Sequence, residues 1–341
     1  MTKLIVVTGI TGNQGSSVAN TFLTDPSWRV RAITRDPSKL SAQEWASRGV
    51  ELVRGDMDDV NSLYKAFTGA HAIFAMTDYW FPLFDPAVRA EAAKMGICPE
   101  ERAAAIEVQR GKNLAHAAAM PEVLKTLERY VYSSLADHLK LSGGKYTHSW
   151  HFDSKAAVEQ YVRDNPNLGP KSSFIHVGLY ADNWTRTHLE IQRDPVSGGY
   201  WHIDVGDGRR LAPIVWTQRD TGPLVRKLVE DVQPGTRLLA VSQMLTYREF
   251  MAIWAKVLGK KLAGDEGIKQ VAEQDFKEMV GGDESHKDHI LQSYLMLRDF
   301  GYDGGDEHTV YPEDIGAEGL MTSFEEYVKQ EDWSSLFKRE R

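Results

Sequence analysis

A short glycine-rich stretch near the N-terminus has the residue types and spacing that bind a phosphate. It reads VVTGITGNQGSSVANTF over residues 6–22, and it places Gly9, Gly12 and Gly15 three apart behind an apolar run. In a strand–turn–helix unit the first glycine permits the tight turn, the second lets the backbone approach a pyrophosphate, and the third lets helix and strand pack closely. The helix N-terminus then offers N–H groups and a partial positive charge to the phosphates. The stretch predicts dinucleotide binding, and a purely structural turn is the alternative.

The choice of dinucleotide depends on the residue that follows the second expected strand. Arg35 lies twenty residues after Gly15. At this distance NAD sites usually carry Asp or Glu for the ribose 2′-hydroxyl, whereas NADP sites carry Arg for the 2′-phosphate. A guanidinium makes paired, charge-assisted hydrogen bonds to phosphate, and Lys39 adds a second positive charge. Asp36 is counter-evidence, although it also suits a turn before Pro37, so the pattern favours NADP(H) over NAD(H).

Strands alternate with helices through the first half of the chain, and these elements must position the loop. Apolar periodicity predicts strands at 3–9, 29–35, 50–56, 70–77, 127–135 and 171–180, and helices at 14–25, 41–49, 60–69, 104–120 and 151–165. This alternation implies right-handed βαβ crossovers and a parallel sheet. We therefore predict an α/β fold, a doubly wound parallel-sheet Rossmann domain that binds its ligand at the carboxyl ends of the strands.

The character of the sequence changes beyond Tyr180. Residues 196–216 are rich in glycine and irregular, without the alternation of strand and helix. Amphipathic helices are expected at 220–231, 245–262, 274–280, 289–301 and 323–333, with a strand at 235–242. We expect an NADP-binding Rossmann domain over 1–180, to which 211–245 return, and a smaller, mainly helical substrate or partner portion over 181–210 and 246–341.

The composition is that of an ordinary globular chain, and it argues against several classes of protein. The 341 residues are 42% hydrophobic and 26% charged, with a net charge of −8 and no long basic block, so direct nucleic-acid binding is not expected. No apolar run approaches the roughly 18 residues of a membrane span, and residues 1–9 are expected to form a strand rather than a signal peptide. The eleven histidines show no metal-ligand spacing, so no metal is expected. The single Cys98 fits a reducing compartment, which predicts a cytoplasmic location, or a nuclear one for a regulator.

Six motifs occur in one order and at typical separations, namely GITGNQGSSVA, ITRDPSK, VELVRGDMDD, QRGKNLAHAA, ERYVYSSL and HFDSKAAVEQYVR. Together they resemble the NmrA-like proteins, atypical members of the short-chain dehydrogenase/reductase superfamily. The likeness extends to RDTGPLVRKLVED, LTYREFMAIWAKVLGK and TSFEEYVKQ. It implies a Rossmann fold that binds NADP(H). Members of this family divide between NADP-dependent reductases and cofactor-sensing regulators that have lost catalysis.

The resemblance also implies which residues at the carboxyl ends of the strands surround the dinucleotide. Asp56 and Met57 would border the adenine, and Arg35 with Lys39 would hold the 2′-phosphate. The inner ribose would lie beside Thr77, Asp78, Tyr79 and Trp80, and the pyrophosphate beside Thr11, Gly12, Asn13 and Gln14. The nicotinamide and its ribose would lie near Ser133, Lys155 and the segment from Tyr180 through Asn183.

Catalysis depends on the helix expected at 151–165. Short-chain reductases that transfer hydride carry Tyr-x-x-x-Lys, in which the Lys lowers the pKa of the phenol and the phenol exchanges a proton with the substrate carbonyl. Here Lys155 is preceded at that spacing by His151. Imidazole exchanges protons near neutral pH, so His151 and Lys155 are the candidate catalytic residues, with Tyr146 and His148 as alternatives to His151. Loss of the phenol equally suits a protein that binds NADP(H) without turnover.

We therefore expect an NADP(H)-dependent oxidoreductase that transfers hydride to a small or mid-sized carbonyl, enone or imine substrate. The aromatic residues Tyr79, Trp80, Phe81 and Phe84 suit the mouth of a site for an apolar or aromatic molecule, although such clusters more often form core. The alternative is a catalytically silent NADP(H)-sensing regulator that binds a protein partner such as a transcription factor. A rearrangement or elimination at the same site is a third hypothesis, and a homodimer is compatible with each.

Overall fold

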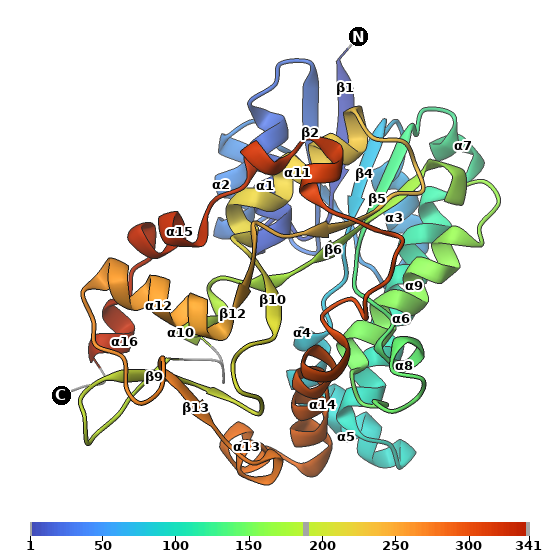
Figure 1. Ribbon diagram of the computed structural model, residues 1–341. Coiled ribbons are helices and arrows are strands. Elements are labelled where there is room, and N and C mark those ends of the chain that lie inside the picture. Colours follow the sequence, from blue (N-terminus) through green and yellow to red (C-terminus); the bar gives the residue numbers. More distant parts are fainter. Residues whose placement is uncertain (1, 187–190, 339–341) are drawn as a thin grey trace.

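An eight-stranded parallel sheet forms the centre of the protein (Figure 1). The structure is a computed structural model that describes residues 2–186 and 191–338. The strand order is β14-β11-β6-β5-β4-β1-β2-β3. The strands are β1 (Lys3–Val7), β2 (Trp28–Thr34), β3 (Glu51–Arg54), β4 (Ala72–Ala75), β5 (Arg129–Ser134), β6 (Ser172–Val177), β11 (Arg237–Ala240) and β14 (Thr309–Val310). The chain runs outward from β1 to β3 and then returns to β4 on the other side of β1, which opens a ligand-binding crevice at their carboxyl ends.

The expected α/β class is confirmed, because all six strands predicted in the first half of the chain lie in this one sheet. The segment expected to be a strand at 235–242 forms β11, which pairs in parallel with β6. β14 then pairs with β11 at the sheet edge. Two elements from the second half of the chain therefore extend the sheet.

Both faces of the sheet are buried at its centre, which explains why β1 and β4 are nearly continuous apolar runs, whereas β2 and β3 toward the edge carry Arg and Glu side chains. In β1 the side chains of Ile5 and Val7 face one helical layer, and those of Leu4 and Val6 face the other. The first layer holds α1 (Asn13–Leu23), α2 (Leu40–Ser47) and α11 (Thr217–Glu230) (Figure 1). The second holds α3 (Val60–Phe67), α6 (Pro99–Ala118) and α9 (Trp150–Arg163).

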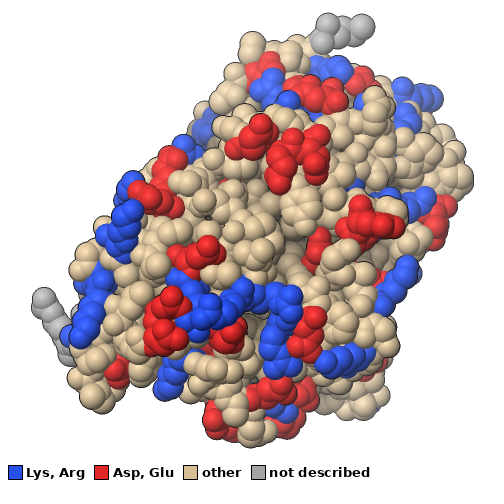
Figure 2. Space-filling model, in the orientation of Figure 1, with Lys and Arg blue, Asp and Glu red and all other residues tan. Residues whose placement is uncertain are grey.

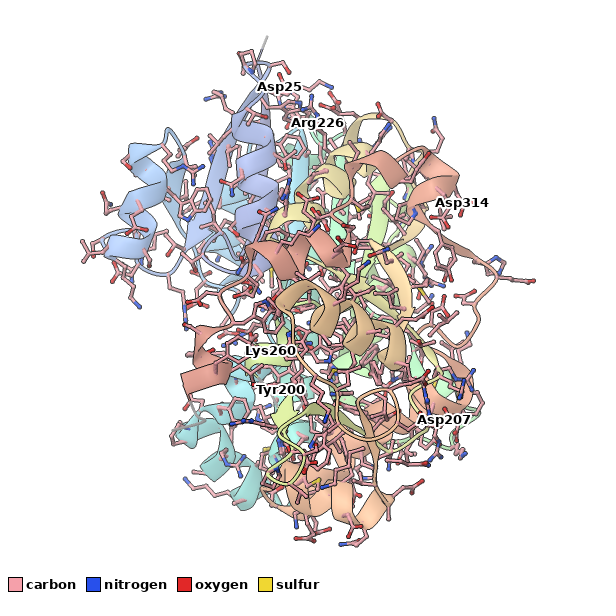
Figure 3. All side chains as sticks on the ribbon, turned by 60° about the vertical axis from the view of Figure 1, so that its left-hand side comes forward. Asp25, Tyr200, Asp207, Arg226, Lys260 and Asp314 are labelled. Carbon is pink, nitrogen blue, oxygen red and sulfur yellow. The ribbon has the colours of Figure 1, made fainter. Side chains whose placement is uncertain are left out.

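Helix α11 packs unusually close to α1, although the two are far apart in sequence. A Cβ atom added to Gly222 would lie 2.2 Å from the backbone oxygen of Ser17, so only glycine allows this approach. An ion pair of 2.5 Å between Arg226 and Asp25 joins the same two segments (Figure 3). The packing holds residues 217–230 against the helix that follows the glycine loop.

The remaining elements, except α7 (Pro121–Leu124) before the amino end of β5, form a separate region of structure beyond the carboxyl ends of the strands (Figure 1). Small sheets are built from β7 (Leu179–Tyr180), β10 (Leu211–Val215) and β12 (Gln243–Thr246), and from β8 (Gln192–Arg193), β9 (Tyr200–Asp204) and β13 (Ile268–Gln270). The helices are α4 (Trp80–Phe84), α5 (Pro86–Met95), α8 (His138–Leu141), α10 (Asn183–Arg186), α12 (Tyr247–Leu258), α13 (Glu273–Val280), α14 (Glu284–Phe300), α15 (Phe324–Gln330) and α16 (Ser334–Lys338). The expectation that 196–216 is irregular was wrong, because β9 and β10 lie there. Their partner strands are supplied by segments that precede and follow them along the chain.

A separate aromatic core stabilises the region beyond the carboxyl ends of the strands. Trp184 is fully buried and stacks on Phe250 of α12 with ring centroids 3.9 Å apart. Trp254 is also fully buried and lies against Tyr200 of β9, whose ring is 5.7 Å from the ammonium of Lys260 (Figure 3). Offset and edge contacts of this kind add to the area that aromatic side chains bury.

Charged side chains of both signs are mixed over the surface. Figure 2 shows a central area of uncharged residues on one face, with acidic side chains above it and a band of Lys and Arg below it that Asp and Glu interrupt. Within residues 2–186 and 191–338, no helix is both long and apolar enough to cross a bilayer.

Candidate nucleotide-binding and active site

The three glycines of the N-terminal loop differ in what surrounds them. Gly9 has a positive φ of 66°, and an added Cβ atom would lie 2.8 Å from the sulfur of Met76. A Cβ atom at Gly15 would lie 2.2 Å from the oxygen of Gly9, whereas at Gly12 the nearest atom is that same oxygen at 3.4 Å. Gly9 therefore makes the turn, Gly15 lets α1 approach the strand, and Gly12 leaves its backbone uncovered.

The first turn of α1 lies at the carboxyl end of β1, and its side chains are held by distant segments. Gly12 caps the helix without a side-chain acceptor for the N–H groups of this turn. The amide of Gln14 donates to the hydroxyl of Tyr180 at 2.7 Å, and Gln218 donates to the side-chain oxygen of Asn13 at 2.9 Å. An uncapped helix N-terminus with its flanking side chains fixed in place is suited to an anion.

The residues predicted to hold the adenosine part lie after β2 and β3. Arg35 is exposed, and its guanidinium carbon lies 5.0 Å from the ring centroid of Phe81. Lys39 is also exposed, at the N-cap of α2. The carboxylate of Asp36 accepts hydrogen bonds from the backbone N–H and the hydroxyl of Ser38, at 2.9 and 2.6 Å. This is the local turn that the sequence offered as the alternative role for Asp36.

The loop after β3 is held by its own turn and by α6. The Asp56 side chain accepts from the N–H of Asp58 at 3.0 Å, and the backbone oxygen of Met57 accepts from Asn113 at 2.8 Å. Arg110 of α6 pairs with the carboxylate of Asp58 at 2.7 Å, which holds the pKa of that carboxyl below its usual range. This loop therefore has a defined position from which to border a ligand.

A cavity of about 720 Å³ lies at the carboxyl ends of β1, β4, β5 and β6 and extends beneath α14. It brings together these predicted site residues: Asn13, Gln14, Thr77, Asp78, Tyr79, Ser133, His151, Lys155, Tyr180 and Asn183. It does not include Gly9, Thr11, Gly12, Arg35, Lys39, Asp56 or Met57, which lie on the loops after β1, β2 and β3, or Gly15, which lies in the first turn of α1. Some of the predicted residues therefore line the cavity, and the others lie next to it at the carboxyl ends of β1, β2 and β3. Their contacts with a cofactor remain predictions.

Lys155 borders the cavity, but its charge is already paired. Its ammonium forms an ion pair with Glu107 of α6, a residue with no exposed surface, and lies 3.3 Å from the backbone oxygen of Thr77. The other oxygen of Glu107 accepts from the hydroxyl of Ser154 at 2.5 Å. Thr77 donates to Glu107 at 2.8 Å and contacts the hydroxyl of Tyr132 at 3.0 Å. A buried carboxylate is stable only when its hydrogen bonds and charge are satisfied in this way.

His151 lies one turn before Lys155 on α9 and is half-buried in the cavity wall. Its Nδ1 lies 3.0 Å from Nε2 of His289, which α14 contributes and which is fully buried. Nδ1 of His289 lies 2.6 Å from the backbone oxygen of His148. Burial lowers the pKa of His289 to about 4. The imidazole at the usual tyrosine position is therefore oriented by a second imidazole.

Three of the phenols that line the cavity, those of Tyr79, Tyr180 and Tyr302, are protonated and hydrogen-bonded. Tyr79 is buried, and its hydroxyl donates to the backbone oxygen of Glu100 at 3.3 Å. The hydroxyl of Tyr302 donates to the backbone oxygen of Val177 at 2.6 Å. Burial raises the pKa values of both and raises the pKa of Tyr180 to about 12. Among these groups, the imidazole of His151 is the one whose chemistry suits proton exchange near neutral pH.

The two upstream alternatives to His151 point elsewhere. Tyr146 is buried against the C-terminal helices, and its hydroxyl bonds to Asp299 at 2.5 Å. The ring of His148 contacts Gln292 at 3.0 Å. Neither residue lines the cavity. Of the aromatic residues after β4, Tyr79, Trp80 and Phe84 line it, whereas Phe81 lies under Arg35.

Sequence reasoning missed Glu107 and His289. For Glu107 a signal existed, because it shares the apolar face of α6 with Ala103, Gly111 and Leu114, where a lone carboxylate needs a buried partner. For His289 there was no such signal, since α14 carries two histidines, His286 and His289, and nothing local shows which one faces α9. Glu107 contacts Lys155 and His289 contacts His151, so both residues reach the site through partners on α9.

Comparisons with known proteins agree with this architecture. The model of the NmrA-like family matches residues 1–328. The NmrA-like family domain-containing oxidoreductase ptmS of Penicillium ochrochloron is 31% identical over 279 residues, which cover 76% of this chain and 74% of that protein. The corresponding oxidoreductase hkm9 of Aspergillus hancockii is 28% identical, with the same coverage of both chains.

Solved structures share the fold at lower sequence identity. NmrA, a negative transcriptional regulator crystallised with NADP, superposes with a TM-score of 0.72 at 21% identity, covering 96% of this chain and 95% of that one. The triphenylmethane reductase of Citrobacter sp. gives a TM-score of 0.67 at 20% identity, covering 96% and 98%. With the family model matched over nearly its whole length, the chain belongs to the NmrA-like family.

Proposed function

We propose that this protein is an NADP(H)-dependent oxidoreductase that reduces a small or mid-sized organic molecule bearing a carbonyl, enone or imine. The observation that carries the proposal is one cavity that joins Asn13 and Gln14 of the glycine loop to His151 and to apolar side chains of α14. A bound nicotinamide would supply the hydride there, and the chain would supply orientation, exclusion of water and a proton. The oxidoreductase names of the fungal relatives support this interpretation of the site.

The preference for NADP(H) rests on Arg35. Its exposed guanidinium and the nearby Lys39 suit a 2′-phosphate, and the carboxylate of Asp36 is engaged with Ser38 rather than turned toward a ribose. NmrA has been crystallised with NADP and also with NAD, so the fold accepts both dinucleotides. We therefore propose a preference for NADP(H) over NAD(H). The 2′-phosphate is the group that distinguishes the two dinucleotides.

The substrate would lie beside His151 and the aromatic residues that line the cavity, because the rings of His151 and Trp80 are themselves in contact, with centroids 5.1 Å apart. Trp80 and Phe84 line the cavity with nearly parallel rings whose centroids are 6.3 Å apart, and both are partly exposed. Tyr294 and Leu297 of α14 also line the cavity. We propose a planar, largely apolar substrate whose oxygen or nitrogen faces His151. On this basis 1–180 with 211–245 would bind the cofactor, and 181–210 with 246–341 would complete the substrate or partner side.

The test is cofactor binding followed by turnover. Dissociation constants are measured for NADPH, NADP⁺, NADH and NAD⁺, and NADPH absorbance is then followed against a panel of aromatic carbonyl and enone compounds. We expect tighter binding of NADPH than NADH, turnover of at least one panel member, and loss of that turnover in His151→Phe. His116→Phe, at an exposed histidine of α6, is the matched control. Turnover that survives in His151→Phe would exclude His151 as the proton source.

A regulator that senses NADP(H) is the second candidate function, and one observation favours it. The ammonium of Lys155 is committed to the buried Glu107, and no phenol occupies the usual tyrosine position. NmrA itself is a negative transcriptional regulator. Tight NADP(H) binding without turnover of any panel compound, together with a protein partner recovered only in the presence of cofactor, would replace the enzymatic proposal with this one.

A further inference from the structure

Two histidines in contact connect the cavity wall to a backbone carbonyl. Nδ1 of His151 lies 3.0 Å from Nε2 of His289, and Nδ1 of His289 lies 2.6 Å from the backbone oxygen of His148. His151 is half-buried and borders the cavity, whereas His289 has no exposed surface. The two rings meet nearly edge to face, at 76° with centroids 4.8 Å apart. This geometry gives Nδ1 of His151 and both ring nitrogens of His289 a defined partner.

The partners determine where the protons lie. A carbonyl oxygen only accepts hydrogen bonds, so Nδ1 of His289 must carry a proton and donate it to His148. Full burial disfavours the charged ring and lowers the pKa of His289 to about 4, so at neutral pH its Nε2 is unprotonated and accepts. The proton between the two rings must therefore belong to Nδ1 of His151. In neutral His151, Nε2 is then the basic nitrogen.

We propose that His289 is a positioning residue that holds His151 in the Nδ1–H tautomer, so that Nε2 of His151 exchanges the proton with the substrate. The proposal rests on the proposed function, in which His151 is the proton source. In the reducing direction NADPH would supply the hydride and become NADP⁺; the hydride would form a C–H bond at the carbonyl carbon, and the electron pair of the broken C=O π bond would move to oxygen. That oxygen takes the proton from Nε2 of the His151 imidazolium, which becomes neutral, and a proton from solvent restores it.

The bond to His289 need not change during this cycle. Nδ1 of His151 carries a proton in both the neutral and the charged ring, so Nε2 of His289 accepts in both states. Glu100 of α6, His286 of α14 and His148 before α9 act electrostatically on His289, the phenol ring of Tyr79 packs against both imidazoles, and Glu100 lies 3.4 Å from Nδ1 of His286. The orienting group itself is a neutral ring rather than a carboxylate. His289 therefore orients the His151 ring but adds no negative charge that would stabilise the imidazolium form of His151.

The first test observes the tautomer directly and does not depend on turnover. The full-length protein is labelled with ¹⁵N-histidine, and the ring nitrogens are read by long-range ¹H–¹⁵N correlation at pH 7.5, with His151 assigned by its loss in His151→Phe. We expect a protonated Nδ1 and an unprotonated Nε2 for His151 in the wild type. In His289→Leu we expect a shift toward the Nε2–H form. A wild-type His151 in the Nε2–H form, or a tautomer unchanged in His289→Leu, would overturn the proposal.

The second test separates positioning from packing. His289→Gln offers an amide oxygen toward His151 and an amide N–H toward His148, so it should keep the Nδ1–H tautomer. We expect kcat to fall about tenfold or more in His289→Leu, with KM and the NADPH dissociation constant unchanged, and to recover most of its value in His289→Gln. An equal loss in both variants, with both folded by circular dichroism, would contradict positioning. If no substrate is turned over, the oxidoreductase function fails, whereas the tautomer measurement still decides the role of His289.

Discussion

Lys155 of α9 forms an ion pair with Glu107 of α6, and the carboxylate of Glu107 has no exposed surface. In a Tyr-x-x-x-Lys site the lysine acts on a neighbouring phenol, but here its charge compensates a carboxylate. The same carboxylate receives hydrogen bonds from Thr77 at the end of β4 and from Ser154 of α9. The ion pair and its hydrogen bonds therefore link α6 and α9 to the end of β4, which borders the cavity.

Removing the lysine should destabilise the protein strongly. Lys155→Met leaves the charge of Glu107 buried and unpaired, and we expect the free energy of unfolding to fall by about 3–5 kcal/mol. The double variant Lys155→Met/Glu107→Gln should recover part of this loss, because the neutral amide no longer needs a cation. Urea unfolding measures both. Lys65→Met, at an exposed position of α3, serves as the control, and a double variant no more stable than the single one would refute this account.

Two glycines of the N-terminal loop should respond to alanine in opposite ways. A Cβ atom at Gly15 would lie 2.2 Å from the oxygen of Gly9, so Gly15→Ala must displace α1 from the strand and lower the melting temperature. Gly12 has φ −96°, which alanine adopts, and only one backbone atom within 4 Å of an added Cβ. Gly12→Ala should leave the melting temperature nearly unchanged and weaken NADPH binding about tenfold, because the methyl group occupies the pyrophosphate surface.

These two variants are compared by thermal unfolding and by titration with NADPH. A Gly12→Ala protein that binds NADPH as tightly as the wild type would show that the pyrophosphate lies elsewhere. A stable Gly15→Ala protein would instead contradict the close packing of α1 on the strand.

Replacing Arg35 should change the choice of dinucleotide. Loss of a charge-assisted hydrogen bond to phosphate costs about 1.5–3 kcal/mol, which corresponds to a roughly 10- to 100-fold weaker NADPH complex for Arg35→Ser. NADH binding should stay within about twofold, because NADH lacks the 2′-phosphate. Arg29→Ser, at an exposed position of the same strand, is the control. Isothermal titration with both dinucleotides decides the matter, and equal weakening of NADPH and NADH would reject the assignment.

The buried His138 should make stability depend on pH. Its ring stacks on Phe152 with centroids 3.7 Å apart and contacts the backbone oxygen of Tyr302 at 3.3 Å. Burial lowers its pKa to about 3, from the ordinary histidine value of 6.5. Below pH 6.5 the unfolded chain therefore binds a proton at His138 that the folded protein does not bind. The contribution of His138 to stability is fully present above pH 6.5 and is lost as the pH falls.

By pH 4.5 the contribution of His138 to this loss should be on the order of 2–3 kcal/mol, since one pKa unit corresponds to about 1.4 kcal/mol. Urea unfolding between pH 7.5 and 4.5 measures it. His138→Gln cannot titrate and should flatten the dependence by that amount, whereas His116→Gln should not. An unchanged slope in His138→Gln would mean that His138 is already protonated in the folded protein.

The sequence by itself determined the fold class and the position of the loop. β1 and β4 are runs of apolar and β-branched residues, β2 alternates apolar residues with arginine, and both patterns are local properties of the chain. The glycine spacing is equally local, because the turn at Gly9 and the approach of Gly15 involve residues of one strand–turn–helix unit. The strands β9 and β10 were missed because their pairing partners lie elsewhere in the chain.

The tertiary structure alone decided what the candidate catalytic residues do. Lys155 and Glu107 are 48 positions apart, and His151 and His289 are 138 positions apart. The sequence does not show which tautomer a histidine adopts or which carboxylate a lysine pairs with. Both properties follow from which helix packs opposite and how much water it excludes, because burial forces each charge and each ring nitrogen to find a partner.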